Sequence, residues 1–385
     1  MTPQPFRLRI ADAAIADLHA RLDMTRWPDQ PAGLPWAHGA DLAWMQRLAT
    51  YWRHRFDWRA QEQRLNAFAQ YTTPLHGIQL HYIHEAGQGP APMPLLLSHG
   101  WPGSVFEFAE LIPRLTDPAR FGADPADAFT VVAPSLPGYG LSFRPGQPGF
   151  SVEQIADAFA ALMTDVLGYG RFATQGGDWG ASISARLGLV HPHKTVGVHL
   201  NLLPIARDPA RLGSSPAAQR YREELQHWLR EETGYSAIQG TRPHTLAFGL
   251  SDSPIGLTAW IAEKMRAWSD CDGDIESVFS LDEILANVSL YWFTGAIGSS
   301  FWPYYARQHA AQWPIPEGAT VDVPMGYAEF PAEILHPPRE LAERTFTDIR
   351  RWSAMPRGGH FAAMEQPELL AEEIRAFYRP LRGTA

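Results

Sequence analysis

The sequence predicts an α/β fold, built on a mostly parallel sheet with helices on both of its faces. Three observations predict it. Strand and helix patterns alternate between residues 93 and 200, a helical and aromatic stretch without a clear strand follows, and strand patterns then resume. We therefore expect, in chain order, an N-terminal segment that wraps the core (1–89), a sheet domain (90–203), an inserted helical cap (204–305) and the rest of the sheet domain (306–385).

The individual elements follow from the local periodicity. Alternating or continuous apolar runs predict strands, which we place at 78–84, 93–98, 129–133, 172–174, 195–200, 321–323 and 352–355. Apolar residues at helical spacing predict helices, which we place at 11–23, 41–56, 181–189 and 367–378. Ser151, with Gln154 three residues later, predicts a capping box at the start of a further helix.

Composition and charge exclude several classes of function. The chain has 385 residues, of which 45% are hydrophobic and 19% charged, as is usual for a globular protein. A formal net charge of -9 argues against nucleic acid or an anionic membrane surface as a partner. Cys271 is the single cysteine, which fits a reducing compartment, and no apolar run is long enough to cross a bilayer. We expect a cytoplasmic protein without a membrane anchor.

Residues 176–180 carry the strongest chemical signal. They read Gly-Gly-Asp-Trp-Gly and lie between a predicted strand and a predicted helix. This is the form of a nucleophile elbow, in which small residues permit a sharp turn and the central side chain projects at the carboxyl edge of the sheet. We therefore predict that Asp178 is a nucleophile.

Aspartate in place of serine changes which bonds can be attacked. A carboxylate that attacks a carboxylic ester gives an anhydride, which is an unfavourable route. A carboxylate that attacks a saturated carbon gives an ester with the protein, and water can then cleave that ester. The substrate must carry a leaving group on saturated carbon, such as an epoxide oxygen or a halide.

Two further segments supply partners for this nucleophile. The loop 99–102, His-Gly-Trp-Pro, follows an earlier buried strand, as an oxyanion-hole loop does. We expect the backbone N–H groups of Trp101 and Trp179 to stabilise the oxyanion that forms when water attacks the ester. His360 follows the last strand between glycines and a phenylalanine, and its imidazole is suited to deprotonate that water.

A histidine base needs a carboxylate that orients its ring. Glu333 follows a late strand and lies between nucleophile and histidine in chain order, so we choose it for this role. Asp348 and Glu329 are the rival candidates.

Taken together, these motifs resemble the microsomal-type, or juvenile-hormone-type, epoxide hydrolases of the α/β-hydrolase superfamily, in the form of a soluble bacterial member. The resemblance covers nearly the whole chain. Residues 51–59 and 81–84 are similar to the N-terminal segment of the family, 99–104, 176–180 and 358–361 to its catalytic core, and 252–257 and 287–295 to its cap. It implies an α/β-hydrolase fold with an inserted helical cap, and hydrolysis of an apolar epoxide to a vicinal diol.

The resemblance also implies roles for single residues. Asp178 matches the nucleophile, His360 the base and Glu333 its carboxylate partner. The family uses two cap tyrosines to bind and protonate the epoxide oxygen; Tyr304 matches one, with Tyr305 as a rival one residue away. At the expected place of the other tyrosine, this sequence has Trp260. Its indole N–H can donate a hydrogen bond to the oxygen, or the ring can form a wall of the pocket or part of the cap core.

Other functions stay open at this stage. The same aspartate and histidine would serve a haloalkane-type dehalogenase, with the indoles of Trp101, Trp179 and Trp260 as halide donors. A catalytically silent binding protein that has kept the pocket is a third interpretation. We expect a small epoxide substrate as the partner, no cofactor, no metal ion, and a homodimer as the candidate assembly.

Overall fold

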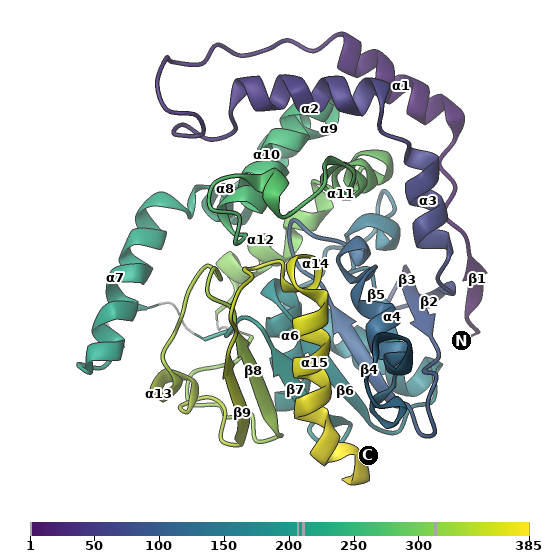
Figure 1. Cartoon of the computed structure of the whole chain (residues 1–385), viewed down its shortest axis with the longest axis vertical. Helices are drawn as coiled ribbons and strands as arrows, with labels where there is room; N and C mark the ends of the chain where they lie inside the picture. The colour runs from purple at the N-terminus through teal and green to yellow at the C-terminus, as the bar shows by residue number, and fades with distance from the viewer. Residues whose placement is uncertain (1, 206–207, 210–211, 312–313, 385) are drawn as a thin grey trace.

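The centre of the molecule is a twisted sheet of nine strands in the part of the chain described by the computed structural model, which covers residues 2–384 apart from 206–207, 210–211 and 312–313. The strand order is β1-β2-β3-β5-β4-β6-β7-β8-β9 (Figure 1). The strands from β5 through β9 pair in parallel, whereas β1, β2 and β3 add to the β5 edge in antiparallel pairs. The strand bounds are β1 Gln4–Phe6, β2 Gln70–Leu75, β3 Ile78–Glu85, β4 Met93–Ser98, β5 Phe129–Pro134, β6 Phe172–Gly176, β7 Thr195–Leu200, β8 Met325–Glu329 and β9 Ile349–Ala354.

Helices cover both faces of this sheet, which explains the continuous apolar runs of its central strands. Helices α5 (Val152–Ala161) and α6 (Asp178–Val190) pack on one face, and α4 (Leu111–Thr116) and α15 (Pro367–Tyr378) pack on the other (Figure 1). The predicted capping box is present, because Ser151 Oγ accepts from the backbone N–H of Gln154 and the Gln154 side chain accepts from the N–H of Ser151. Two short helices, α13 (Arg339–Ala342) and α14 (Ala362–Glu365), lie in late loops.

Two details of the predicted sheet are wrong, and proline accounts for both. The strand expected at 321–323 begins only at Met325; before it, Val321 makes a single bridge to Phe346. Pro324 has no N–H for a ladder, so regular pairing starts after it. Strands β1 and β2 were not expected, because Pro5 and Pro74 interrupt their patterns; both strands lie towards the edge of the sheet, where proline is tolerated.

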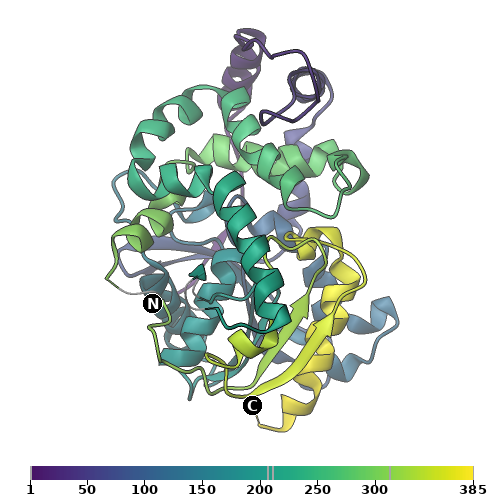
Figure 2. The same ribbon diagram turned by 90° about the vertical axis from the view of Figure 1, so that its left-hand side faces the viewer.

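Between β7 and β8 the chain forms a layer of helices over the carboxyl ends of the parallel strands (Figures 1 and 2). This layer corresponds to the predicted cap. Its helices are α7 Pro216–Glu231, α8 Gly234–Thr241, α9 Pro243–Asp252, α10 Pro254–Ala267, α11 Leu281–Thr294 and α12 Trp302–His309. Within the described ranges, none of the helices of the molecule combines the length and the apolar character needed to cross a membrane.

The N-terminal segment lies across the far side of the cap helices. Figure 1 shows α1 (Asp12–Asp23) and α2 (Leu42–His54) over α9 and α10, with α3 (Trp58–Asn66) descending beside the sheet. Polar contacts join the layers: Arg21 Nη1 lies 2.8 Å from Asp252 Oδ1, and the Tyr51 hydroxyl donates to Asp282 Oδ1 at 2.9 Å. The N-terminal segment thus holds the cap from outside while its strands extend the sheet. The exact domain boundaries stay a prediction.

The turn from β6 into α6 is sterically tight. Asp178 has a φ of 48°, which a residue other than glycine adopts only under constraint. A Cβ on Gly180 would lie 1.9 Å from the carbonyl oxygen of Ser98 in β4, and one on Gly176 would lie 2.2 Å from the backbone of Gly180. The small residues of the motif are therefore required for helix α6 to start directly against the sheet.

We predict that Gly180→Ala destabilises the folded protein by about 3 kcal/mol, because the added methyl group must displace backbone rather than a side chain. Urea unfolding measures the effect. Gly249→Ala is the control: a Cβ there meets nothing within 4 Å, and alanine favours the helix α9, so stability should stay the same or rise by up to about 1 kcal/mol. Equal stabilities for the two variants would contradict the steric explanation.

Candidate active site

The carboxylate of Asp178 lies against the loop that follows β4. The backbone N–H of Trp101 donates to Asp178 Oδ1 at 2.8 Å. A Cβ on Gly100 would lie 2.1 Å from the same oxygen, so only glycine permits this approach. The backbone N–H of Trp179 belongs to the first turn of α6, directly after Asp178. The loop after β4 and the start of α6 thus meet at the carboxylate of Asp178.

The loop itself is held by buried hydrogen bonds from two directions. His99 Nε2 accepts from the backbone N–H of Leu136 at 3.1 Å, and burial lowers the pKa of His99 to about 4, so the ring stays neutral. From the cap helix α11, Asn287 Nδ2 donates to the carbonyl of Pro102 and the Tyr291 hydroxyl donates to the carbonyl of Gly103, both at 2.7 Å. Sheet and cap together fix where the Trp101 N–H points.

His360, on the loop after β9, also lies close to Asp178. Its Nε2 lies 3.5 Å from Asp178 Oδ2, and its Nδ1 lies 2.6 Å from Glu333 Oε1. The backbone N–H of Ile334 also donates to Glu333 Oε1, at 2.7 Å. The rival carboxylates lie elsewhere, since Asp348 pairs with Arg350 and Glu329 accepts from the indole of Trp352. Of the three candidates, the fold brings Glu333 to the imidazole.

The cap also holds the loop that carries His360. The backbone N–H of His360 donates to the carbonyl of Trp268 at 2.8 Å. Glu365 accepts from three backbone N–H groups, those of Asp270, Gly359 and Phe361, each at 2.9 Å. These bonds tie the segment after α10 to the histidine loop, so the imidazole is positioned by both layers.

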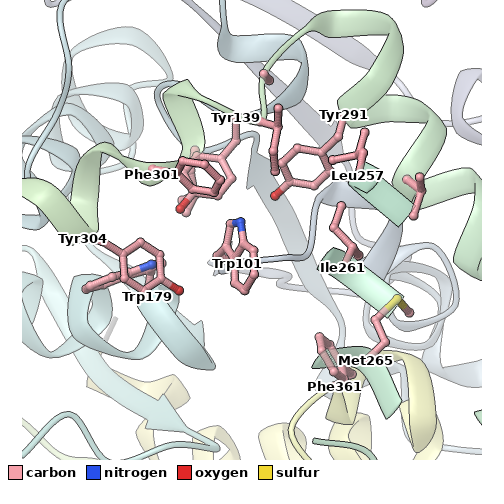
Figure 3. Packing of buried hydrophobic residues seen from close by; sticks show 14 of the residues in the cluster. Trp101, Tyr139, Trp179, Leu257, Ile261, Met265, Tyr291, Phe301, Tyr304 and Phe361 are labelled. Atoms are coloured by element: carbon pink, nitrogen blue, oxygen red, sulfur yellow. The ribbon is translucent and has the colours of Figure 1, made fainter. Parts of the chain in front are cut away.

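Two tyrosines from the cap face Asp178 across a cavity of about 310 Å³. Tyr235 begins α8 and Tyr304 lies in α12, and the two hydroxyl-bearing side chains are hydrogen-bonded to each other. The Tyr235 ring stacks on Trp101 with centroids 5.2 Å apart, and the Tyr304 ring meets Trp179 edge-on at 4.7 Å. Figure 3 shows Tyr304 beside Trp179 and Trp101. Burial, with Tyr235 and Asp178 nearby, raises the pKa of Tyr304 well above its usual range, so the phenol keeps its proton.

The expected positions of Trp260 and Tyr305 need correction. Trp260 does not line this cavity; its indole N–H donates to Gln239 Oε1 at 2.9 Å, inside the cap. Tyr305 stacks on His309 at 4.0 Å on the outer side of α12, because neighbouring residues of a helix point about 100° apart. Tyr235, which was not predicted, lies beside Tyr304 at the cavity where Trp260 was expected. The available signal was weak: Tyr235 and Gln239 are four residues apart and share the buried face of α8.

Comparison with known families gives matches on two overlapping parts of the chain. Residues 3–108 match the family model described as "Epoxide hydrolase N terminus", and residues 93–235 match the one described as "alpha/beta hydrolase fold". A relative from Stigmatella aurantiaca that is assigned as an epoxide hydrolase is 43% identical over 98% of this chain and 85% of its own length. Epoxide hydrolase 1 of Oryctolagus cuniculus is 37% identical over 97% of this chain and 88% of its own. The chain belongs to the epoxide hydrolase family.

Solved structures agree with this assignment. The juvenile hormone epoxide hydrolase of the silkworm Bombyx mori superposes with a TM-score of 0.87 at 28% identity, covering 100% of this chain and 95% of that one. The predicted family and the α/β-hydrolase fold are therefore confirmed. Among the residues that the structure describes, we find no group of three or more His, Cys, Asp or Glu side chains arranged to hold a metal ion.

The charges in this epoxide hydrolase site are strongly coupled. Burial acts to lower the pKa of His360, but the carboxylates of Glu333 and Asp178 outweigh it and raise the pKa to about 10. A protonated imidazole cannot accept a proton from water. Part of the increase comes from the negative charge of Asp178, so any event that neutralises Asp178 lowers the pKa of His360.

We predict that Asp178→Asn lowers the pKa of His360 by at least about one unit, since the variant removes one of the two anions beside the ring. NMR titration of the imidazole protons between about pH 6 and 11 measures this pKa. The variant His360→Gln identifies the His360 signal, and mass analysis verifies that the amide introduced at position 178 has not hydrolysed. An unchanged titration of His360 would contradict the coupling.

Proposed function

We propose that this protein hydrolyses an apolar epoxide to a vicinal diol through an ester between Asp178 and a substrate carbon. The observation that carries the proposal is the placement of Asp178 between two phenols on one side and the His360–Glu333 pair on the other. The cavity of about 310 Å³ has the size of a small-molecule site, and its apolar lining residues include Trp179, Leu202, Pro204, Ile205, Trp228, Leu229 and Ile334.

In the first half of the reaction, a carboxylate oxygen of Asp178 attacks a ring carbon of the epoxide. A bond forms between that oxygen and the carbon, and the bond from the carbon to the epoxide oxygen breaks. The departing oxygen takes a proton from the phenol of Tyr304 or Tyr235, while the other phenol donates a hydrogen bond to it. Neutral phenols are suited to this step because they hold a proton close to the developing negative charge.

In the second half, water attacks the Asp178 carbonyl carbon. Esterification has removed the charge of Asp178, which lowers the pKa of His360, so the imidazolium releases its proton to solvent and the neutral ring can then accept one from the water. The Trp101 and Trp179 N–H groups stabilise the oxyanion, and Glu333 stabilises the imidazolium. Collapse expels the diol, whose oxygen takes the proton from His360, and the proton released when the carboxylate re-forms returns to the tyrosinate. His360 takes a proton back from solvent once Asp178 is charged again.

A single turnover in ¹⁸O-labelled water tests the ester. With protein in excess over styrene oxide, the oxygen added to the first diol should come from Asp178 and be unlabelled, and the label should enter the carboxylate. Label in the diol itself would contradict a covalent intermediate. Asp178→Ala should abolish turnover, which also separates this function from that of a silent binding protein.

Removal of either phenol should slow ester formation. We predict that Tyr304→Phe and Tyr235→Phe each reduce the rate of that step on the order of a hundredfold, because each removes a donor to the leaving oxygen. Rapid-mixing measurements of ester formation report it. Tyr305→Phe and Trp260→Phe are matched controls outside the cavity, and both should keep the rate within about threefold; a large loss in either would contradict the assignment of the donors.

The dehalogenase interpretation is less well supported. Of the three indoles considered as halide donors, Trp260 is engaged with Gln239, and the cavity carries two phenols that halide release does not need. A cytoplasmic location, suggested by the single cysteine, and a homodimeric assembly stay predictions.

A further inference from the structure

Glu107 is a half-buried carboxyl group that the reaction described above does not use. It lies in the turn of 3₁₀ helix Val105–Phe108, directly after the oxyanion loop. It lines a second, smaller cavity of about 20 Å³, together with Asp178 and His360. That volume accommodates about one water molecule. Asp178 lines both cavities, so the carboxylate that reacts with substrate in the large cavity also faces the small one.

The position of the Glu107 carboxylate is set by the loop backbone. A Cβ on Gly103 would lie 1.4 Å from Glu107 Oε1, so the carboxylate occupies the space that any larger residue at 103 would fill. The backbone N–H of Ser104 is hydrogen-bonded to it. The same loop is fixed from the cap by Tyr291, which donates to the Gly103 carbonyl at 2.7 Å. The side chain is thus held in one place by the loop that also forms the oxyanion hole.

The small cavity is polar. Ser98 and Gln175 line it, and their atoms Ser98 Oγ and Gln175 Oε1 are buried without a hydrogen-bond partner among the described residues. Gln175 Nε2 donates to Asn201 Oδ1 at 2.8 Å, which fixes the orientation of the amide. A cavity of this size with several convergent polar groups has the properties of an ordered-water site.

Electrostatics couples Glu107 to both reacting groups. Burial raises the pKa of Glu107 to about 8; the charge of His360 acts to lower it and that of Asp178 to raise it. Esterification removes the charge of Asp178 and the later loss of a proton from His360 removes the opposing charge, so these two changes act on the pKa of Glu107 in opposite directions.

We propose that Glu107 is a positioning residue for the hydrolytic water, an inference that rests on the proposed function. Its carboxylate accepts a hydrogen bond from one O–H of the water, while His360 takes the proton of the other. The water oxygen adds to the carbonyl carbon of Asp178, and Glu107 neither gains nor loses a proton. Glu107 therefore acts in ester hydrolysis and has no part in ester formation.

Glu107→Gln tests this division, because the amide keeps the shape of the side chain but loses the charge. With styrene oxide as the probe, rapid mixing and acid quench followed by mass analysis measure the formation and decay of the ester. We expect ester formation within about threefold of the unmodified protein and hydrolysis slowed on the order of a hundredfold, so that the ester accumulates. Glu107→Asp keeps a charged carboxylate and should hydrolyse the ester faster than Glu107→Gln.

Glu110→Gln is the matched control. Glu110 is an exposed carboxylate three residues further on, 3.1 Å from Arg64 Nη2, and its variant should leave both rates unchanged. Ester hydrolysis in Glu107→Gln at the rate of the unmodified protein would overturn the proposal. So would an equal decrease of the hydrolysis rate in Glu107→Asp and Glu107→Gln, or an equal slowing of ester formation and ester hydrolysis in Glu107→Gln. If the unmodified protein forms no ester with any epoxide, the proposed function itself fails. If it forms and hydrolyses the ester normally, only the role of Glu107 is in question.

Discussion

The close approach of the loop after β4 to the start of α6 is the constraint on which the site depends. Glycines at 100 and 180 let backbone and carboxylate meet at distances that a Cβ would block, and the Trp101 N–H donates to Asp178 there. The strained φ of Asp178 persists because this packing leaves its backbone no alternative. Every proposed chemical role, from ester formation to stabilisation of the oxyanion, requires that one carboxylate to be held in that position.

The site also separates the two halves of the proposed reaction in space. The phenols of Tyr235 and Tyr304 face Asp178 from the large cavity, whereas His360 and Glu107 lie with it around the small one. The electrostatic coupling between Asp178 and His360 accounts for the order of the two halves of the proposed reaction. The free Asp178 carboxylate helps keep His360 protonated, and its conversion to a neutral ester favours the neutral imidazole, which can act as a base.

The cap contributes more than a cover for the substrate. Helix α11 holds the oxyanion loop through Asn287 and Tyr291, and the segment after α10 holds the histidine loop through Trp268 and Asp270. The N-terminal helices bind the cap from its outer side. The loops of the sheet domain that carry the candidate site are thus held by two segments of the cap, and the N-terminal helices in turn contact that cap.

The sequence by itself determined the features whose signals are local. The alternation of strands and helices, the capping box at Ser151, the small residues around Asp178 and the placement of His360 after the last strand are each contained in a short window, so periodicity and turn chemistry were sufficient. Only the tertiary structure decided which side chains meet. It selected Glu333 over Asp348 and Glu329, brought Tyr235 to Tyr304 while turning Trp260 towards Gln239, and set Glu107 beside the reacting groups. These choices depend on how helices and loops distant in the chain pack against one another, and local patterns of hydrophobicity do not encode the direction in which a side chain finally points.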